Sequence, residues 1–340
     1  MEDTVGIIGI GSFGTAIANL LAHNTGVLMF SRNINSVKNI NENHQNYGQE
    51  MNPRIRATNS LEEVAAQCRL IFPIVPSKSF RVMMQNLGPY LRPYHLFIHG
   101  TKGFDALPPE YEKLSADTQI STMSEVILQE SCVRRIGCLS GPNLAKEIME
   151  GQPTATVIAS QFDEVIEIGK AVLNSRLFHV YGSHDILGAE VAGALKNIIA
   201  LGSGILRGYG LGKNIQAMLI SKGLMEMIYF GKAFGAESRS FLGTAGVGDL
   251  VATATSDKSR NYTFGFRLGQ GENIEDIRKT TEELAEGVRT LRLTHNLAKH
   301  RKIRLPITRM LHKIIFEGYD IGQAIDYLIK YPYDIDVDFL

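Results

Sequence analysis

The sequence predicts an α/β N-terminal domain with a mainly parallel sheet, followed by an all-α C-terminal domain. Three observations lead to this prediction. Short apolar runs alternate with amphipathic segments in the first half, which is typical of strands joined by crossover helices. Two long segments, at about 186–206 and 214–234, are apolar on nearly every face, as expected for central helices of a helical domain. The 340 residues suffice for two cores, which we divide as 1–184 and 185–340.

Six apolar runs are expected to form the strands of the sheet. They are "TVGIIGI" (4–10), "GVLMFS" (26–31), "RLIFPIV" (69–75), "HLFIHG" (95–100), "RRIGCLSG" (134–141) and "ATVIAS" (155–160). In the second half, amphipathic segments that include "EDIRKTTEELAEGVRT" predict further helices to about residue 330. The tail "YPYDIDVDFL" has no helical period and is expected on the surface.

The composition excludes some classes of partner. The 35 basic and 35 acidic residues cancel, so no global charge favours a nucleic acid or a membrane surface. The cysteines at 68, 132 and 138 are odd in number and lack metal-ligand spacing, which fits a reducing cytoplasm and predicts no metal site. No uninterrupted apolar segment approaches the roughly 18 residues of a membrane span, and no basic region precedes the first strand. We therefore expect a cytoplasmic protein.

A glycine-rich turn after the first strand predicts a dinucleotide site. Gly9, Gly11 and Gly14 form a G-x-G-x-x-G pattern between an apolar strand and an amphipathic helix. The pattern alone is weak, but this context is that of a Rossmann-like fingerprint. The glycines allow a tight turn, and the N–H groups that begin the helix can bind a pyrophosphate. A merely structural turn is the less favoured alternative.

The end of the second strand bears on the choice between NAD and NADP. An acidic residue normally binds the adenosine ribose there, but this chain has Ser31 and Arg32. A guanidinium can receive a 2′-phosphate or stack on adenine, so NADP is tolerated. A solvated Arg32 is the alternative, and the preference between NAD and NADP stays open.

Two further strand ends carry polar groups where open α/β sheets bind ligands. "IHGTKGF" (98–104) places Lys102 directly after a strand, and "LSGPNLAKEI" (139–148) places Gly141 and Asn143 in a strand-to-helix turn. Each could also be an ordinary connection.

The first long apolar helix contains an unexpected charge. In "EVAGALKNIIALGSG" (190–204), Lys196 shares its helical face with Ala, Gly and Ile residues, which cannot pair with an ammonium. Burial of an unpaired ammonium is costly. Either Lys196 extends to water, or a group distant in sequence, such as a ligand, pairs with it.

The polar stretch "GTAGVGDLVATATSDKSRNYTFG" (243–265) lies between apolar helices. Asp249 and Thr253 are four residues apart and would share one face of a helix. Ser259 is a predicted N-cap, which puts Arg260 and Asn261 in the first turn of the next helix. A cation there opposes the helix dipole unless an anion binds, so these residues suggest a phosphate site. A solvated turn is the alternative.

Taken together, these segments resemble the bacterial-type soluble members of the NAD(P)-dependent glycerol-3-phosphate dehydrogenase family. The matching segments follow in order along nearly the whole chain: "GIGSFGTAIA", "VPSKSFR", "TKG", "SGPNLAKEI", "GAEVAGALKNIIA", "GVGDLVATAT", "SRNYTFG" and "AEGVRT". The resemblance implies a cytoplasmic, usually dimeric enzyme that reduces dihydroxyacetone phosphate to sn-glycerol 3-phosphate with NAD(P)H. This product supplies glycerophospholipid synthesis.

The resemblance also implies roles for individual residues. Lys196 matches the catalytic lysine, and Asp249 and Thr253 match residues around the reacting oxygen. The other implied substrate-binding residues are Lys102, Gly141, Asn143, Asn197, Ser259, Arg260 and Asn261. The implied cofactor-binding residues are Gly9, Gly11, Ser12, Phe13, Gly14, Arg32, Lys102, Ala145, Arg260 and Glu286.

Two residues depart from the family pattern. Tyr262 stands where bacterial members commonly have a second Arg after "SRN", and Asn143 stands where Ser or Thr is usual. The first departure bears on the strength or cofactor preference of the anion site.

Our mechanistic hypothesis is that Lys196, held by Asp249, stabilises and protonates the carbonyl oxygen during hydride transfer. Another two-domain 3-hydroxyacid or 3-hydroxyacyl dehydrogenase is one alternative, which the "SRN" anion site disfavours. A nucleotide-sensing regulator is the other, but a sensor needs none of Lys196, Asp249 and Arg260.

Overall fold

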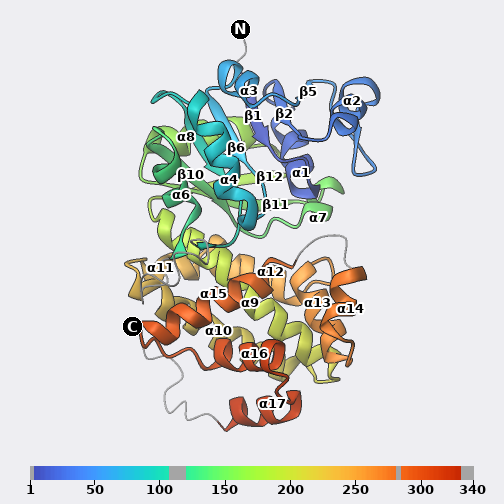
Figure 1. Cartoon of the computed structure of the whole chain (residues 1–340), viewed down its shortest axis with the longest axis vertical. Helices are drawn as coiled ribbons and strands as arrows, with labels where there is room; N and C mark the ends of the chain where they lie inside the picture. The colour runs from blue at the N-terminus through green and yellow to red at the C-terminus, as the bar shows by residue number, and fades with distance from the viewer. Residues whose placement is uncertain (1–3, 107–119, 281–284, 331–340) are drawn as a thin grey trace. The chain divides into compact units, whose positions relative to one another are not determined.

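The computed structural model describes residues 4–106, 120–280 and 285–330 and forms two compact units (Figure 1). Unit 1 comprises Met1–Asp105 and Ser121–Glu190, and unit 2 comprises Ala106–Ile120 and Val191–Leu340. The units divide inside helix α9 (Ile186–Gly208), whereas the predicted boundary after residue 184 precedes this helix. The predicted surface tail, 331–340, lies outside the described residues.

Unit 1 contains an eight-stranded sheet in the order β12-β11-β10-β7-β6-β1-β2-β5. All neighbouring strands are parallel except β10 and β11, which confirms the predicted, mainly parallel sheet. The six predicted strands are β1 (Val5–Ile8), β2 (Val27–Phe30), β6 (Leu70–Pro73), β7 (Leu96–His99), β10 (Arg135–Ser140) and β11 (Thr154–Ser160). Two short ribbons, β3 (Gln45–Asn46) with β4 (Gln49–Glu50) and β8 (Asp105–Ala106) with β9 (Ile120–Ser121), lie outside this sheet.

The two edge strands, β5 (Ile55–Thr58) and β12 (Phe178–Ser183), are not among the predicted strands. Buried and exposed residues alternate along β12, and Arg56 is exposed in β5. An edge strand is covered less completely than a central one, so its sequence has no continuous apolar run.

Helices cover both faces of the sheet in unit 1. One core cluster contains residues of α1 (Ser12–Leu21), α2 (Ile34–Asn43), α7 (Ala145–Met149) and α8 (Asp163–Leu173). The other contains residues of α3 (Leu61–Gln67), α4 (Ser77–Leu87) and α6 (Met123–Glu130), with a 3₁₀ turn at Gly88–Tyr90. This arrangement is that of a doubly wound, Rossmann-like domain.

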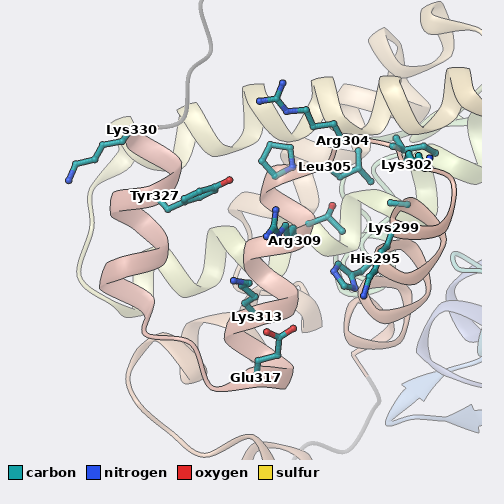
Figure 2. Close-up of a pocket in the computed structure, with 14 residues that line it drawn as sticks. His295, Lys299, Lys302, Arg304, Leu305, Arg309, Lys313, Glu317, Tyr327 and Lys330 are labelled. Carbon is teal, nitrogen blue, oxygen red and sulfur yellow. The ribbon is translucent and has the colours of Figure 1, made fainter.

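Unit 2 is helical around the two predicted apolar helices, α9 and α10 (Lys213–Ala233). The others are α11 (Ser238–Leu242), α12 (Asp249–Thr255), α13 (Arg260–Gly269), α14 (Ile274–Thr280), α15 (Glu286–His300), α16 (Pro306–Glu317) and α17 (Ile321–Ile329). The predicted glycine-rich turn forms a π-helical turn at Thr244–Gly248 that leads directly into α12. A cavity of about 960 Å³ lies among α15, α16 and α17 (Figure 2).

Glycines bring α9 and α13 into backbone contact. A Cβ on Gly204 of α9 would lie 2.1 Å from the Tyr262 carbonyl oxygen, and one on Gly265 would lie 2.1 Å from that of Leu201. Neither position could therefore hold a larger residue without a shift of the backbone. This close packing sets the start of α13 beside the middle of α9, where Lys196 and Asn197 lie.

Helix α9 is long and apolar enough to span a membrane by length and composition alone. However, 89% of its apolar window is buried inside the structure. It has the burial of a central helix in a folded domain.

A buried carboxylate from α10 caps the start of α16. Glu226 accepts hydrogen bonds from the Ile307 and Thr308 amides and from the Thr308 hydroxyl, the last at 2.8 Å. Burial raises the pKa of Glu226 to about 7 from its ordinary value of 4.5, although these hydrogen bonds oppose the rise. The folded protein therefore holds a proton here at pH values where the unfolded chain does not.

We expect this proton to make stability fall as the pH rises. The stabilisation from proton uptake at Glu226 is complete below pH 4.5 and is lost as the pH rises through about 7. Urea unfolding of the wild type and Glu226→Gln at pH 5 and pH 8 measures this effect. Between pH 5 and pH 8, the free energy of unfolding of the wild type should fall by on the order of 3 kcal/mol more than that of the variant. An equal loss in both proteins would contradict the assignment.

Candidate active site

The glycine-rich turn of unit 1 has the geometry of a dinucleotide site. Gly9 has φ of +122°, and a Cβ there would lie 2.1 Å from the Ile74 carbonyl oxygen. A Cβ on Gly14 would lie 2.2 Å from the Gly9 carbonyl oxygen, whereas one on Gly11 would meet nothing within 4 Å. Helix α1 begins after Gly11, and this N-cap residue makes no side-chain hydrogen bond to the helix. Gly9 and Gly14 thus shape the turn, and Gly11 leaves room for a pyrophosphate at the helix N-terminus.

Because their surroundings differ, Gly11 and Gly14 should respond differently to replacement by alanine. Gly11→Ala should weaken NADH binding about tenfold, because its methyl group enters the space for the pyrophosphate, with little change in Tm. Gly14→Ala should lower Tm by several degrees, because the backbone must shift. Fluorescence titration with NADH and thermal unfolding compare the two variants. If Gly11→Ala bound NADH as the wild type does, the turn would not be the pyrophosphate site.

The two residues at the end of β2 differ in exposure. Ser31 is buried, and its hydroxyl accepts a hydrogen bond from the Asn33 amide at 3.0 Å. Arg32 is exposed, and its proposed contact with the adenosine end of the cofactor stays a prediction. The Phe13 ring of α1 packs near Gly100, at the end of β7.

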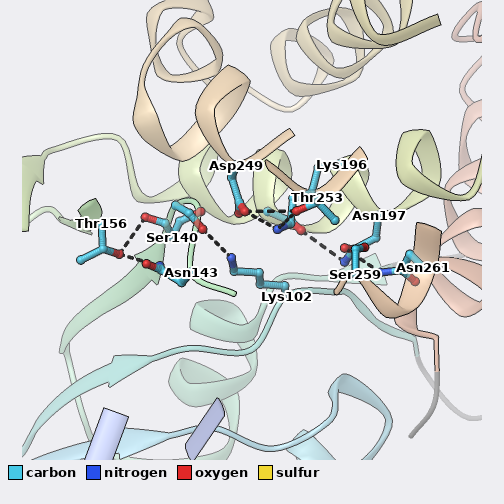
Figure 3. Close-up of polar contacts among 12 residues, drawn as sticks. Lys102, Ser140, Asn143, Thr156, Lys196, Asn197, Asp249, Thr253, Ser259 and Asn261 are labelled. Atoms are coloured by element: carbon cyan, nitrogen blue, oxygen red, sulfur yellow. Dashed lines mark hydrogen bonds and ion pairs between the residues drawn. The ribbon is translucent and has the colours of Figure 1, made fainter. Parts of the chain in front are cut away.

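The two polar strand ends predicted in unit 1 meet in the structure (Figure 3). Lys102 donates a hydrogen bond from Nζ to the Gly141 carbonyl at 2.9 Å. Gly141 has φ of +144° and lies against Thr156 of β11. Asn143 donates from Nδ2 to the Thr156 hydroxyl at 2.8 Å, while its buried Oδ1 has no partner among the described residues. Lys102 and Asn143 are therefore held at the carboxyl ends of the neighbouring strands β7 and β10.

Lys196 forms a buried ion pair in unit 2 (Figure 3). Its Nζ donates to Asp249 Oδ1 and, at 2.6 Å, to the Thr253 hydroxyl. Asp249 begins α12, and Thr253 lies one turn later, as their spacing predicts. The relative exposures of Lys196 and Asp249 are only 5% and 1%. The lysine does not extend to bulk water, so its partner is a residue distant in sequence.

A chain of amides lies next to this ion pair. Asn261 donates from Nδ2 to Asn197 Oδ1 at 2.9 Å, and its own Oδ1 accepts from the Gly287 amide at 2.8 Å. A Cβ on Gly287 would lie within 3 Å of both Asn261 and the Asn197 carbonyl. These bonds fix the side-chain orientations of both asparagines. Asn197 directly follows Lys196 in α9, and Asn261 lies in the first turn of α13.

Several other predicted site residues begin helices, where backbone N–H groups can bind an anion. Ser259 caps α13 by accepting from the Tyr262 amide at 3.3 Å, as predicted. The first residues of α1, α7, α13 and α15 are Ser12, Ala145, Arg260 and Glu286. Arg260 is exposed and Glu286 is half-buried.

A polar cluster at the start of α9 was not predicted from the sequence. The buried Glu190 carboxylate accepts from the Ser124 amide at 2.8 Å and lies 2.9 Å from His99 Nε2. Burial alone would raise the pKa of Glu190, but the interactions with His99 and Ser124 outweigh it and lower this pKa below its ordinary value. Nothing in the local sequence signals the cluster, because its members are up to 91 residues apart (190 − 99).

No cluster of three or more His, Cys, Asp or Glu side chains that could hold a metal occurs within 4–106, 120–280 and 285–330. The polar groups of the candidate site are amides, hydroxyls, ammonium and guanidinium groups, and the carboxylates of Asp249 and Glu286. Such groups bind organic anions and carbonyl oxygens through hydrogen bonds.

Two family models match the chain in succession. Residues 4–166 match the N-terminal model and residues 185–326 match the C-terminal model of NAD-dependent glycerol-3-phosphate dehydrogenase. Together they cover most of both units.

Curated proteins and solved structures agree with these models. A protein of Pseudomonas paraeruginosa, named glycerol-3-phosphate dehydrogenase (NAD(P)+), is 38% identical over 344 residues, which cover 100% of this chain and 98% of the relative. One of Pseudomonas fluorescens with the same name is 39% identical, with 99% and 96% covered. The crystal structure of glycerol-3-phosphate dehydrogenase from Coxiella burnetii matches with a TM-score of 0.87 and 30% identity, over 97% of this chain and 99% of that one.

Proposed function

Because the chain belongs to the NAD-dependent glycerol-3-phosphate dehydrogenase family, we propose that it reversibly reduces dihydroxyacetone phosphate to sn-glycerol 3-phosphate with NADH or NADPH. The observation that carries this proposal is the buried ion pair of Lys196 with Asp249, completed by Thr253. The neighbours of Lys196 on the same face of α9 include the small residues Ala192 and Gly193, which is consistent with a small ketone as substrate.

Lys196 acts as the general acid in this proposal. Negative charge develops on the carbonyl oxygen as its carbon is reduced, and an ammonium in a buried site stabilises that charge strongly. The Lys196 ammonium then donates a proton to the oxygen to form the hydroxyl group. Asp249 and Thr253 hold Nζ in place through their hydrogen bonds, so little reorganisation is needed during the reaction.

The phosphate of the substrate is bound at the start of α13. The Arg260 guanidinium supplies positive charge, and Ser259, Asn261 and the first N–H groups of the helix supply hydrogen-bond donors. Lys102, Gly141, Asn143 and Asn197 complete the proposed substrate-binding set. Tyr262 cannot add a second guanidinium, so Arg260 carries more of the phosphate recognition in this chain.

The cofactor is bound through the turn at Gly9, Gly11 and Gly14. When bound, the nicotinamide supplies the hydride. The open space at Gly11 and the N-terminus of α1, whose N-cap residue has no side chain, fit a pyrophosphate. Ser12, Phe13, Ala145 and Glu286 are further proposed contacts, with Arg32 at the adenosine end and Lys102 and Arg260 shared with the substrate.

A spectrophotometric assay tests this function. The purified chain is mixed with NADH or NADPH and with dihydroxyacetone phosphate or dihydroxyacetone, and absorbance is followed at the nicotinamide band. We expect oxidation with the phosphorylated ketone and a kcat/KM at least about a hundredfold lower without the phosphate. Equal rates with both ketones would contradict the phosphate site, and no reaction with either would contradict the function.

We also propose a cytoplasmic homodimer whose product supplies glycerophospholipid synthesis. These properties follow from the family resemblance, and the absence of disulfides among the cysteines of the structure fits a reducing compartment. Light scattering of the purified chain should give a mass of about twice 37.5 kDa. A monomer at the concentrations of the assay would contradict the dimer.

A further inference from the structure

A second region of unit 2 concentrates positive charge around a cavity (Figure 2). We call it the basic cavity and define it by Lys299, Lys302, Arg304, Arg309, Lys313 and Lys330, which line it. These residues come from the end of α15, the loop to α16, α16 itself and the residue after α17. None of the proposed catalytic, substrate-binding or cofactor-binding residues lines it.

The charge balance in the cavity differs from that of the chain. Among the described residues, six Lys or Arg side chains line it against one carboxylate, Glu317, whereas the whole chain is neutral. Within the described part of the chain, Lys299, Lys302, Arg309 and Lys330 form no salt bridge. Lys313 instead places Nζ 5.1 Å from the centre of the Tyr319 ring. Cations that outnumber the carboxylates around them raise the local potential, which attracts anions.

Two stacked histidines, His295 and His312, lie at the cavity and have lowered pKa values. His295 lines the cavity and stacks on His312, with ring centres 3.8 Å apart. Burial is the main cause that lowers the pKa of both histidines, and the positive charge of Lys299 lowers each of them further.

Three buried apolar residues, Ala298, Leu305 and Pro306, line the cavity and are called its apolar floor. Leu305 and Pro306 lie at the start of α16. The first amides of α16, at Ile307 and Thr308, already donate to Glu226. An anion would therefore be bound by the flexible cationic side chains at the rim, with the apolar floor available to the organic part of a ligand.

We propose that the basic cavity binds an organic anion that carries two or more phosphate groups. A single phosphate would engage only one or two of the six cations, whereas several phosphates can engage most of them. The volume of about 960 Å³ lies within the range of small-molecule sites, so it accommodates such a ligand. This site is separate from the one at which the proposed substrate phosphate binds.

Calorimetric titration with tripolyphosphate tests the proposal. NADH is present at saturation so that the dinucleotide site is filled. We expect the full chain to bind tripolyphosphate at least about tenfold more tightly than inorganic phosphate. The variant K299Q/R309Q/K313Q should lose at least about tenfold in tripolyphosphate affinity. Unchanged NADH affinity and Tm show that the variant is folded, and R309Q alone should show a smaller loss in the same direction.

A matched control removes the same charge elsewhere. Lys38, Arg176 and Lys213 are exposed and lie outside the cavity, so K38Q/R176Q/K213Q should keep the tripolyphosphate affinity. Equal losses in both triple variants would overturn the proposal, because binding would then follow net charge alone. Wild-type affinity in K299Q/R309Q/K313Q would also overturn it.

The acidic tail of the chain is the main competing occupant. Asp334, Asp336 and Asp338 follow shortly after Lys330 in the sequence. If tripolyphosphate bound only to D334N/D336N/D338N and not to the wild type, the cavity would be a docking site for the tail, and the proposal would be wrong. Equal binding by the wild type and this variant would support a site for an external anion.

Discussion

Lys196→Ala is expected to lower kcat for reduction of dihydroxyacetone phosphate by about a thousandfold or more. A positioned general acid contributes roughly 10²–10⁴-fold, and stabilisation of the developing oxyanion adds to this. Affinity for NADH should change little, because Lys196 is not among the proposed cofactor-binding residues and lies outside the glycine-rich turn. Steady-state rates and an NADH titration measure the two effects.

The variant K196A/D249N separates catalysis from folding. Removal of one partner of a buried ion pair leaves an uncompensated charge, which typically costs about 3–5 kcal/mol in unfolding free energy. The double variant has no such charge, so its Tm should lie above that of Lys196→Ala, while its turnover should stay equally low. Recovery of turnover along with Tm would mean that Lys196 serves stability rather than catalysis.

Arg260→Gln is expected to raise KM for dihydroxyacetone phosphate by about 10- to 100-fold. A charge-assisted hydrogen bond to a phosphate is worth roughly 1.5–3 kcal/mol, which corresponds to this range. With NADH at saturation, so that any loss of a cofactor contact by Arg260 is compensated, the kcat/KM for unphosphorylated dihydroxyacetone should stay nearly unchanged, because that ketone has no phosphate for the guanidinium to bind. Steady-state kinetics of the wild type and the variant with each of the two ketones measure these changes in KM and kcat/KM.

Arg267→Gln is the matched control on the same helix. Arg267 lies near the end of α13 and pairs with Glu272, so its loss removes the same charge without touching the start of the helix. We expect an unchanged KM for dihydroxyacetone phosphate in this variant. If both substitutions raised KM equally, long-range charge rather than a contact by Arg260 would explain phosphate recognition.

The sequence predicts the central part of the fold well, because buried elements have simple patterns. Strands covered on both faces are continuous apolar runs, and the two central helices are apolar all round. The edge strands β5 and β12 lack such a run, and the π-helical turn at Thr244–Gly248 has the composition of an ordinary loop. Local composition could not identify these three elements.

The candidate site is only partly predictable from residue patterns. The spacing of Asp249 and Thr253 predicts that they share a face of α12, and Ser259 is recognisable as a cap. Nothing local predicts that Lys196 pairs with a carboxylate 53 residues away. The expectation that Lys196 and Asp249 lie together comes from the family resemblance, and the structure shows their contact. Likewise, only the packing of α15, α16 and α17 gathers the cations of the basic cavity.

Chemical rescue of Lys196→Ala tests the central claim most directly, since the claim is that the Lys196 ammonium donates a proton. Propylamine replaces the atoms from Cγ to Nζ that the substitution removes. We predict that turnover with dihydroxyacetone phosphate rises in proportion to the propylammonium concentration and that tetramethylammonium, which carries charge but no proton to donate, has no such effect. Near wild-type turnover without amine, or equal rescue by tetramethylammonium, would contradict the role of Lys196 as the general acid.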